Sequence, residues 1–123
     1  VSVAVAAARL AGAARADGVV FTAPITQQGR RGGDTVFDVR LAAFAGPALV
    51  AAHEGDACVA TPAADAPRVL AALSAARPKK LMTFTGGSPP QSAPCEARSA
   101  HGFLGLEAQV MNAVADFILR PGN

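Results

Sequence analysis

The sequence contains neither tryptophan nor tyrosine, and six phenylalanines supply all the aromatic side chains among its 123 residues. Charged residues are also scarce, at 16%, whereas 51% of the residues are hydrophobic. The high apolar fraction excludes a disordered chain. A core without large aromatic side chains has to be built from Val, Leu, Ala and a few Phe, which suits helices packed closely on a buried sheet. The length fits one small domain.

Signals for a nucleic-acid or membrane partner are lacking as well. The eleven Lys and Arg residues are scattered, apart from two adjacent pairs, and the net charge is only +2, so no nucleic-acid partner is expected. No apolar run reaches the length that spans a membrane, so no membrane partner is expected. The chain also lacks an initiator Met and a signal peptide. Its first residues, Val1–Val5, are typical of the inside of an element, and we therefore expect the chain to be part of a longer protein.

Short apolar, β-branched runs alternate along the chain with Ala- and Leu-rich segments of helical spacing. The expected strands span residues 18–23, 48–53 and 80–85, and the expected helices span residues 1–16, 36–44, 63–76 and 104–119. This alternation predicts an α/β fold in which a parallel sheet carries helices on both faces. Three parallel strands are too few to protect both edges of a sheet. We therefore expect residues 1–123 to form a single partial domain whose sheet continues with strands from elsewhere.

Two loops concentrate the side chains that carry chemistry. In an open parallel sheet, ligands bind beyond the carboxyl ends of the strands. The loops after the second and third expected strands lie there, and they hold His53, Glu54, Asp56, Cys58, Cys95, Glu96 and His101. An Asp after one strand and a His after the next can form the pair that orients a catalytic imidazole, so Asp56 and His101 are the candidate acid and base. The alternative is that Asp56 caps a turn and His101 caps the final helix.

The segments around these two residues, 47–62 and 99–118, resemble the C-terminal region of α/β-hydrolase-fold enzymes. In that family the acid follows a strand in a phrase like P-x-L-V-x-H-G-x-x-D-x-x-x-P, and the histidine lies in x-H-G-F before the last helix. Residues 53–56 and 61–62 fit the first phrase, and residues 100–103 fit the second. The order of acid before histidine also matches the family.

The resemblance implies that the chain is the C-terminal half of an α/β-hydrolase fold, with Asp56 and His101 as two members of a Ser-Asp-His triad. The nucleophile elbow G-x-S-x-G does not occur in the sequence. The family's order puts the elbow immediately before Val1, with the oxyanion loop and the first strands further upstream. The resemblance therefore implies a serine hydrolase for a small-molecule ester or amide substrate. The N-terminal half of the same protein would complete it, and no cofactor is expected.

The two cysteines offer three interpretations. Cys58 follows the candidate acid by two residues, and Cys95 lies on the loop that leads to His101. If these loops adjoin, a disulfide would hold acid and base together and would indicate a secreted or periplasmic enzyme, whereas two free thiols would indicate a cytoplasmic one. Metal binding by the cysteines with His53, Asp56 and His101 is disfavoured because no pair has zinc-knuckle spacing. A redox role is disfavoured because C-x-x-C is absent.

Two functions remain open at this point. The first is a serine hydrolase in which Asp56 and His101 serve a nucleophile outside the chain. The second is a non-catalytic binding or interaction domain that keeps the hydrolase-like architecture, which explains the missing nucleophile without a missing segment. A G-x-S-x-G motif directly upstream of Val1 would favour the first, and its absence from the complete gene would favour the second.

Overall fold

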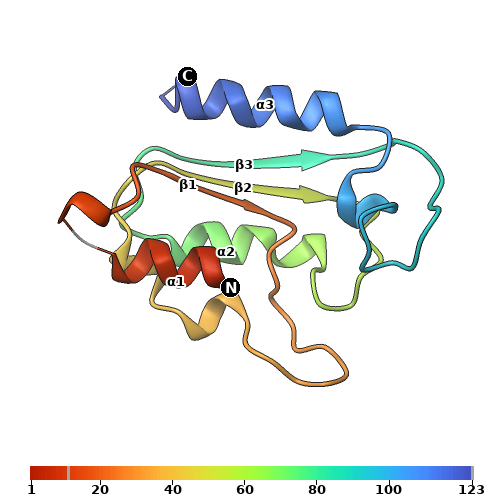
Figure 1. The fold of residues 1–123 in the computed structure, drawn as a ribbon, viewed down its shortest axis with the longest axis horizontal. Helices are drawn as coiled ribbons and strands as arrows, with labels where there is room; N and C mark the ends of the chain where they lie inside the picture. The colour runs from red at the N-terminus through yellow and green to blue at the C-terminus, as the bar shows by residue number, and fades with distance from the viewer. Residues whose placement is uncertain (11, 123) are drawn as a thin grey trace.

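The computed structural model describes residues 1–10 and 12–122, which contain a three-stranded parallel sheet (Figure 1). The strands are β1 (Val19–Thr22), β2 (Ala48–His53) and β3 (Lys79–Phe84), and β2 lies between the other two. Val19 is the partner of Ala48, and β3 starts opposite the same residue. The carboxyl ends of the strands therefore lie at the same end of the sheet. Each strand begins and ends within one residue of its predicted bounds.

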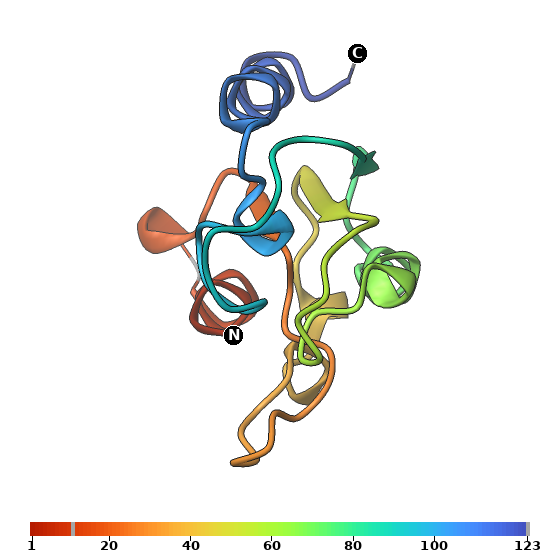
Figure 2. The same ribbon diagram turned by 90° about the vertical axis from the view of Figure 1, so that its right-hand side faces the viewer.

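Helices cover both faces of the sheet. The helices α1 (Ser2–Arg9) and α2 (Ala66–Ala72) lie on one face, and α3 (Glu107–Leu119) lies on the other (Figure 2). This arrangement confirms the predicted α/β class with a parallel sheet between helical layers. It also explains why β2 is apolar from Ala48 to Ala52, since all six of its residues are buried. A strand that is covered on both faces reads as a continuous apolar run rather than as an alternating one.

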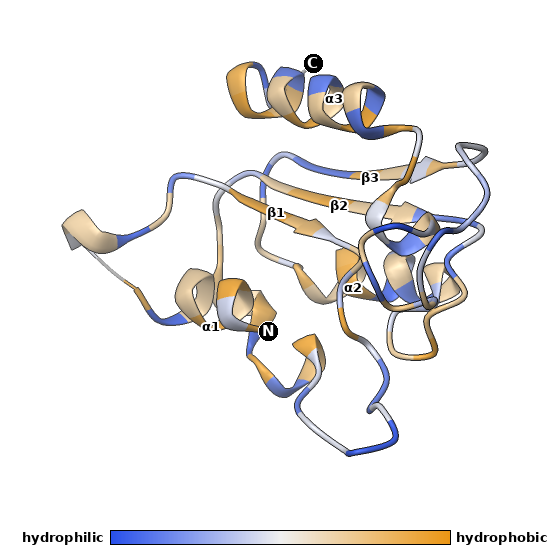
Figure 3. Cartoon of the chain, turned by 45° about the vertical axis from the view of Figure 1, so that its right-hand side comes forward, coloured by the Kyte–Doolittle hydropathy of each residue, from blue (hydrophilic) through white to orange (hydrophobic). Residues whose placement is uncertain are grey.

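The core is divided by the sheet into two clusters. On the side of α1 and α2, Ala48, Val50 and Ala52 of β2 pack with small residues of α1 and with Val and Leu of α2. On the side of α3, Ala51 packs with Phe103 and with residues of that helix. Figure 3 shows β1 and β2 in the colours of hydrophobic residues, whereas β3 begins with hydrophilic ones. The first cluster is much the larger, so it contributes most of the apolar burial.

The described residues leave apolar surface uncovered near β1, which is paired with β2 alone. A groove of 460 Å³ between β1 and α3 is lined by Val19, Val20, Phe117 and Ile118, among others. Ile118, near the end of α3, is 62% exposed beside this groove. The sheet does not extend beneath Ile118, because among the described residues β1 is the edge strand on this side.

The prediction of a helix at 36–44 is wrong, because the segment forms two short 3₁₀ turns, Val36–Asp38 and Leu41–Ala43. The first turn starts at a capping box in which the side chains of Thr35 and Asp38 bond each other's backbone. Val39 then takes extended backbone angles and ends the turn. β-branched residues disfavour continuous helix. The two turns still bury Val36, Leu41 and Phe44, which lie in the larger core cluster.

The helices at the two ends of the chain are shorter than expected. α1 ends at Arg9 because Leu10 is extended, and a 3₁₀ turn follows at Gly12–Ala14; Ala11 of the predicted helix lies outside the described residues. α3 starts at Glu107 rather than at residue 104 because Gly105 takes a φ of 80°. The pKa of Glu107 is lowered by backbone N–H groups at this helix start, which favour a negative charge there.

The segment Ala100–Leu119 has the length and composition of a membrane span, with a mean hydropathy of 1.2 and only 17% of it buried. The continuous α-helix within it is α3, which has 13 residues. A helix of this length extends only about 20 Å, whereas the apolar layer of a bilayer is roughly 30 Å thick. The absence of a membrane partner stays a prediction.

The polar loop after β1 is attached to the start of α2. Thr26 Oγ1 and Gln27 Nε2 both donate hydrogen bonds to Asp65 Oδ2, at 2.9 Å and 2.7 Å. Their backbone N–H groups both donate to the carbonyl of Ala60. The bond from Gln27, followed by that from Thr26, lowers the pKa of Asp65, and Arg68 adds to the effect. These bonds hold the loop after β1 against the loop after β2, where the candidate acid lies.

Candidate active site

The loops that follow β2 and β3 come together beyond the carboxyl ends of the strands, and they bring Asp56 and His101 into contact. His101 Nδ1 lies 3.0 Å from Asp56 Oδ2. The side chain of Asp56 is only 2% exposed, whereas that of His101 is 24% exposed. The two residues are 45 positions apart in the sequence. The expected geometry of an acid beside a histidine is therefore present. Asp56 also caps a turn, because its Oδ1 accepts the backbone N–H of Cys58, whereas His101 does not cap α3.

Hydrogen bonds satisfy the oxygens of Asp56 and set the tautomer of His101. The Asp56 side chain accepts the backbone N–H of Cys58 at 2.9 Å and the hydroxyl of Thr61 at 2.8 Å. A buried polar group needs such partners, because burial without a hydrogen bond costs free energy. His101 Nδ1 faces an acceptor, so the network assigns the proton to Nδ1 and leaves a lone pair on Nε2. Among the described residues no hydrogen bond occupies Nε2. An imidazole in this form can accept a proton from a nucleophile.

His101 lies in a 3₁₀ turn, Ala100–Gly102, that the core anchors on its carboxyl side. Phe103 follows directly and is buried. Its ring packs edge-on against Phe84, the last residue of β3, with 5.8 Å between ring centroids. Aromatic pairs of this geometry stabilise a fold beyond the area that they bury. The sequence phrase His-Gly-Phe thus combines a polar residue at the site with an aromatic anchor in the core.

Gly102 is required by the packing of the loop beneath it. A Cβ atom at this position would overlap the backbone O, C and Cα atoms of Ala97. Backbone atoms cannot move aside as the end of a flexible side chain can. Ala97 belongs to the long loop that precedes the turn, so the lack of a side chain at Gly102 lets this loop pack against the turn that carries His101.

Gly102→Ala is expected to destabilise the protein by about 2–3 kcal/mol, because overpacking against fixed backbone costs energy in this range. The displaced turn would also carry His101 away from Asp56. Denaturant unfolding of the variant measures the loss. Gly29→Ala is the matched control, since a Cβ there meets nothing within 4 Å. Equal midpoints for the two variants would contradict the packing argument.

Cys58 and Cys95 are joined by a disulfide that spans 37 residues. Cys58 is buried, and its backbone N–H is one of the donors to Asp56. Cys95 lies on the loop that leads to His101, where the Ser99 hydroxyl donates to the carbonyls of Pro94 and Glu96. The bond therefore connects the loop of the acid to the loop of the histidine. No thiol is left free among the described residues.

His53 has a structural role beside the site. Its Nδ1 accepts the backbone N–H of Gly55 at 2.8 Å, so Nε2 carries the proton and donates to the carbonyl of Gly86 at 2.9 Å. The ring is buried and ties the loop after β2 to the loop after β3. No group of three His, Cys, Asp or Glu side chains in the described ranges is arranged to hold a metal ion.

A cavity of 280 Å³ adjoins His101 at the carboxyl end of β1. Its lining includes Val1 at the start of α1 and residues 23–25, which follow β1. Ala23 has a φ of 44°, a left-handed conformation that strains an alanine, and its N–H bonds to the carbonyl of Ala51. Strained backbone of this kind concentrates at functional sites. The histidine, the start of α1 and the end of β1 thus share one cavity.

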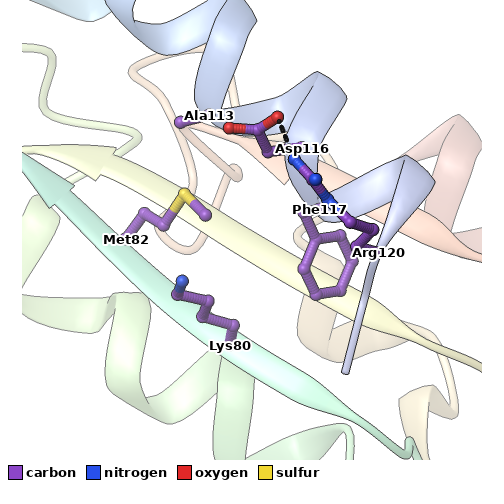
Figure 4. Close-up of a pocket in the computed structure, with 6 residues that line it drawn as sticks. All are labelled: Lys80, Met82, Ala113, Asp116, Phe117 and Arg120. Carbon is purple, nitrogen blue, oxygen red and sulfur yellow. Dashed lines mark hydrogen bonds and ion pairs between the residues drawn. The ribbon is translucent and has the colours of Figure 1, made fainter. Parts of the chain in front are cut away.

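A separate cavity of 310 Å³ lies between β3 and α3 (Figure 4). Lys80 and Met82 line it from the strand, and Asp116, Phe117 and Arg120 line it from the helix. Asp116 pairs with Arg120 at 3.0 Å. Neither member of the acid–histidine pair lines this cavity, and Lys80 lies toward the amino end of β3. We therefore assign the candidate site to the loops at the carboxyl ends of the strands.

One residue of the site was not predicted from the sequence. Thr61 belongs to the phrase that follows the candidate acid, but its hydroxyl was given no role. The structure buries Thr61 and places its Oγ1 within hydrogen-bond distance of both Asp56 and His101. A hydroxyl in a loop has no distinctive spacing, so only its position after the acid was available as a signal.

Comparison of the chain with protein-family models, with curated proteins and with solved structures found no match. The function is therefore argued from the geometry of the site.

Proposed function

We propose that this chain supplies the acid and the base of a serine hydrolase that cleaves ester or amide bonds of small molecules. The observation that carries the proposal is the bond between His101 Nδ1 and Asp56 Oδ2, which leaves Nε2 free beside a cavity. In a triad the acid holds the imidazole in this tautomer and stabilises the imidazolium that forms. The alternative, a turn capped by Asp56 and a final helix capped by His101, does not require the two residues to bond each other.

The chemistry follows from the free lone pair. His101 Nε2 takes the proton of a serine hydroxyl while the serine oxygen attacks the acyl carbon of the substrate. The same nitrogen then returns the proton to the leaving alcohol or amine. A water molecule repeats the sequence on the acyl-enzyme, and the serine is regenerated. No cofactor takes part in these steps.

We propose that the nucleophilic serine precedes Val1 in the full-length protein. Val1 and His101 line the same cavity, so a residue just before α1 would be within reach of the histidine. The single pairing of β1 and the apolar groove beside it offer surface for further strands and helices of the same protein. The chain would then be the C-terminal half of an α/β-hydrolase fold, in which the nucleophile stands on a turn before a helix.

The disulfide favours a compartment outside the cytosol, because glutathione and thioredoxin keep most cytosolic thiols reduced. We propose a secreted or periplasmic enzyme.

A fluorophosphonate probe tests the proposal on the full-length protein. We expect the probe to lose fluoride and to phosphonylate one serine outside residues 1–123, within G-x-S-x-G. His101→Ala should slow the labelling strongly, because the hydroxyl then lacks its base. Glu54→Gln, which changes an exposed carboxylate on the same loop, should label at the wild-type rate. A folded protein in which no serine reacts would favour a non-catalytic binding domain instead.

A further inference from the structure

The hydroxyl of Thr61 stands between the two proposed catalytic residues. Its Oγ1 lies 2.8 Å from Asp56 Oδ2 and 3.0 Å from His101 Nδ1. Asp56 and His101 are themselves 3.0 Å apart, so the three atoms form a closed triangle. Thr61 is only 4% exposed. Water therefore cannot readily replace the hydroxyl if it is removed.

Only one distribution of protons satisfies all three contacts. The Asp56 carboxylate can only accept, so both neighbours must donate to it. The Thr61 hydroxyl has one proton, which goes to Asp56, and its lone pairs then face His101 Nδ1. The Nδ1–H group shares its proton between the carboxylate and the hydroxyl oxygen. If His101 carried its proton on Nε2 instead, Nδ1 would set a lone pair against the carboxylate.

The backbone holds Thr61 in this place. Its N–H donates to the carbonyl of Cys58 at 3.1 Å, which closes a turn behind the candidate acid. The disulfide at Cys58 connects that turn to the loop of His101. Thr61 is therefore fixed relative to both residues that it contacts, and its methyl group is buried with it.

We propose that Thr61 is a positioning residue of the hydrolase, which orients the His101 imidazole and keeps its proton on Nδ1 through a hydroxyl shared with Asp56. This inference rests on the proposed function and adds to it a member that does not touch the substrate. A positioning role predicts a loss in the rate of the chemical step with little change in substrate binding, because the cavity beside His101 is not lined by Thr61.

The test compares Thr61→Val with Thr61→Ser in the full-length protein, assayed on p-nitrophenyl acetate. Valine keeps the shape and removes the hydroxyl, and serine keeps the hydroxyl and removes the methyl group. We expect Thr61→Val to lower kcat on the order of 10-fold, the size of a hydrogen bond to a charged group, with KM unchanged. Thr61→Ser should restore most of kcat. If the valine variant does not fold, Thr61→Ala against Thr61→Ser gives the same comparison.

Rates are taken per mole of folded protein, measured by circular dichroism and size-exclusion chromatography. Wild-type kcat in Thr61→Val, or a serine variant as slow as the valine variant, overturns the role of the hydroxyl. His101→Ala is assayed beside them. If His101→Ala is inactive while Thr61→Val is fully active, only this inference fails. If His101→Ala is also fully active, the proposed function fails with it.

Discussion

His101→Ala in the full-length protein is expected to lower kcat/KM for a model ester by about 10⁶-fold, the loss typical when a triad loses its base. The physical reason is that Nε2 of His101 is the proton acceptor of the proposed mechanism. The other ring nitrogen of His101, Nδ1, is held by Asp56, so the imidazole keeps the orientation that the proton transfer needs. Hydrolysis of p-nitrophenyl acetate, followed by absorbance, measures the effect.

Asp56→Asn is expected to lower kcat by about 10⁴-fold, for a different reason. The amide has nearly the shape of the carboxylate, so the loop keeps its turn. If the amide oxygen keeps the bond from the N–H of Cys58, the NH₂ group takes the place of Oδ2. An NH₂ group only donates, so it accepts neither the Thr61 hydroxyl nor the Nδ1–H of His101. The imidazole then moves its proton to Nε2, where the lone pair is needed. The loss therefore appears in kcat while the fold is retained.

Glu54→Gln is the matched control for both variants, because it removes a charge from the same loop at an exposed position. It should leave kcat/KM unchanged, and all three proteins should unfold at similar denaturant concentrations. Near wild-type hydrolysis by either His101→Ala or Asp56→Asn would contradict the assignment of the triad pair.

The strands could be predicted closely because two local signals agree in each of them. The apolar run of β2 covers residues 48–52, it follows Pro47, and His53 ends it. Such boundaries in the sequence match the ends of the strand because parallel strands buried on both faces contain few polar residues. The helices were predicted less well. The spacing of the apolar side chains in residues 36–44 fits one helix as well as two short turns that bury the same residues.

The helix ends depended on backbone angles that the sequence pattern does not encode. Leu10 is a good helix former and yet ends α1, and Phe103 takes a φ of 58° just before α3. Phe103 is buried, so tertiary packing overrides its intrinsic propensity. Leu10 is 46% exposed, and its packing does not account for the end of α1. The exposure of Ile118 could not be predicted either. The helical pattern predicts an apolar stripe, but it does not say how far the sheet extends beneath the helix.

The titratable residues of the candidate site could be predicted from the sequence, whereas the non-titratable ones could not. Asp56 and His101 follow adjacent strands, so the fold rule for parallel sheets brings their loops together. The roles of Thr61 and Gly102 became visible only with the structure, because each depends on which atoms meet in the folded loops. Gly102 packs against Ala97 across a tight turn, and the hydroxyl of Thr61 meets a histidine 40 residues away.

The double substitution Cys58→Ala/Cys95→Ala is expected to lower the free energy of unfolding by about 4 kcal/mol, from the chain entropy that a loop of this length gains on release. The bond spans 37 residues, and it crosses from the loop of Asp56 to the loop of His101. Guanidinium unfolding of the full-length protein measures the loss. A stability change of this size exceeds the effect of most single substitutions.

The same substitution should also lower kcat, because the disulfide holds the turn in which the N–H of residue 58 donates to Asp56. Reduction of the wild-type protein with dithiothreitol should reproduce both losses, and the double variant, which has no bond to break, should be insensitive to the reductant. Two free thiols titrated in the unfolded, unreduced wild-type protein would rule out the bond. A reduced protein with full stability and full activity would show instead that other contacts, such as the ring of His53 between Gly55 and Gly86, suffice to hold the two loops together.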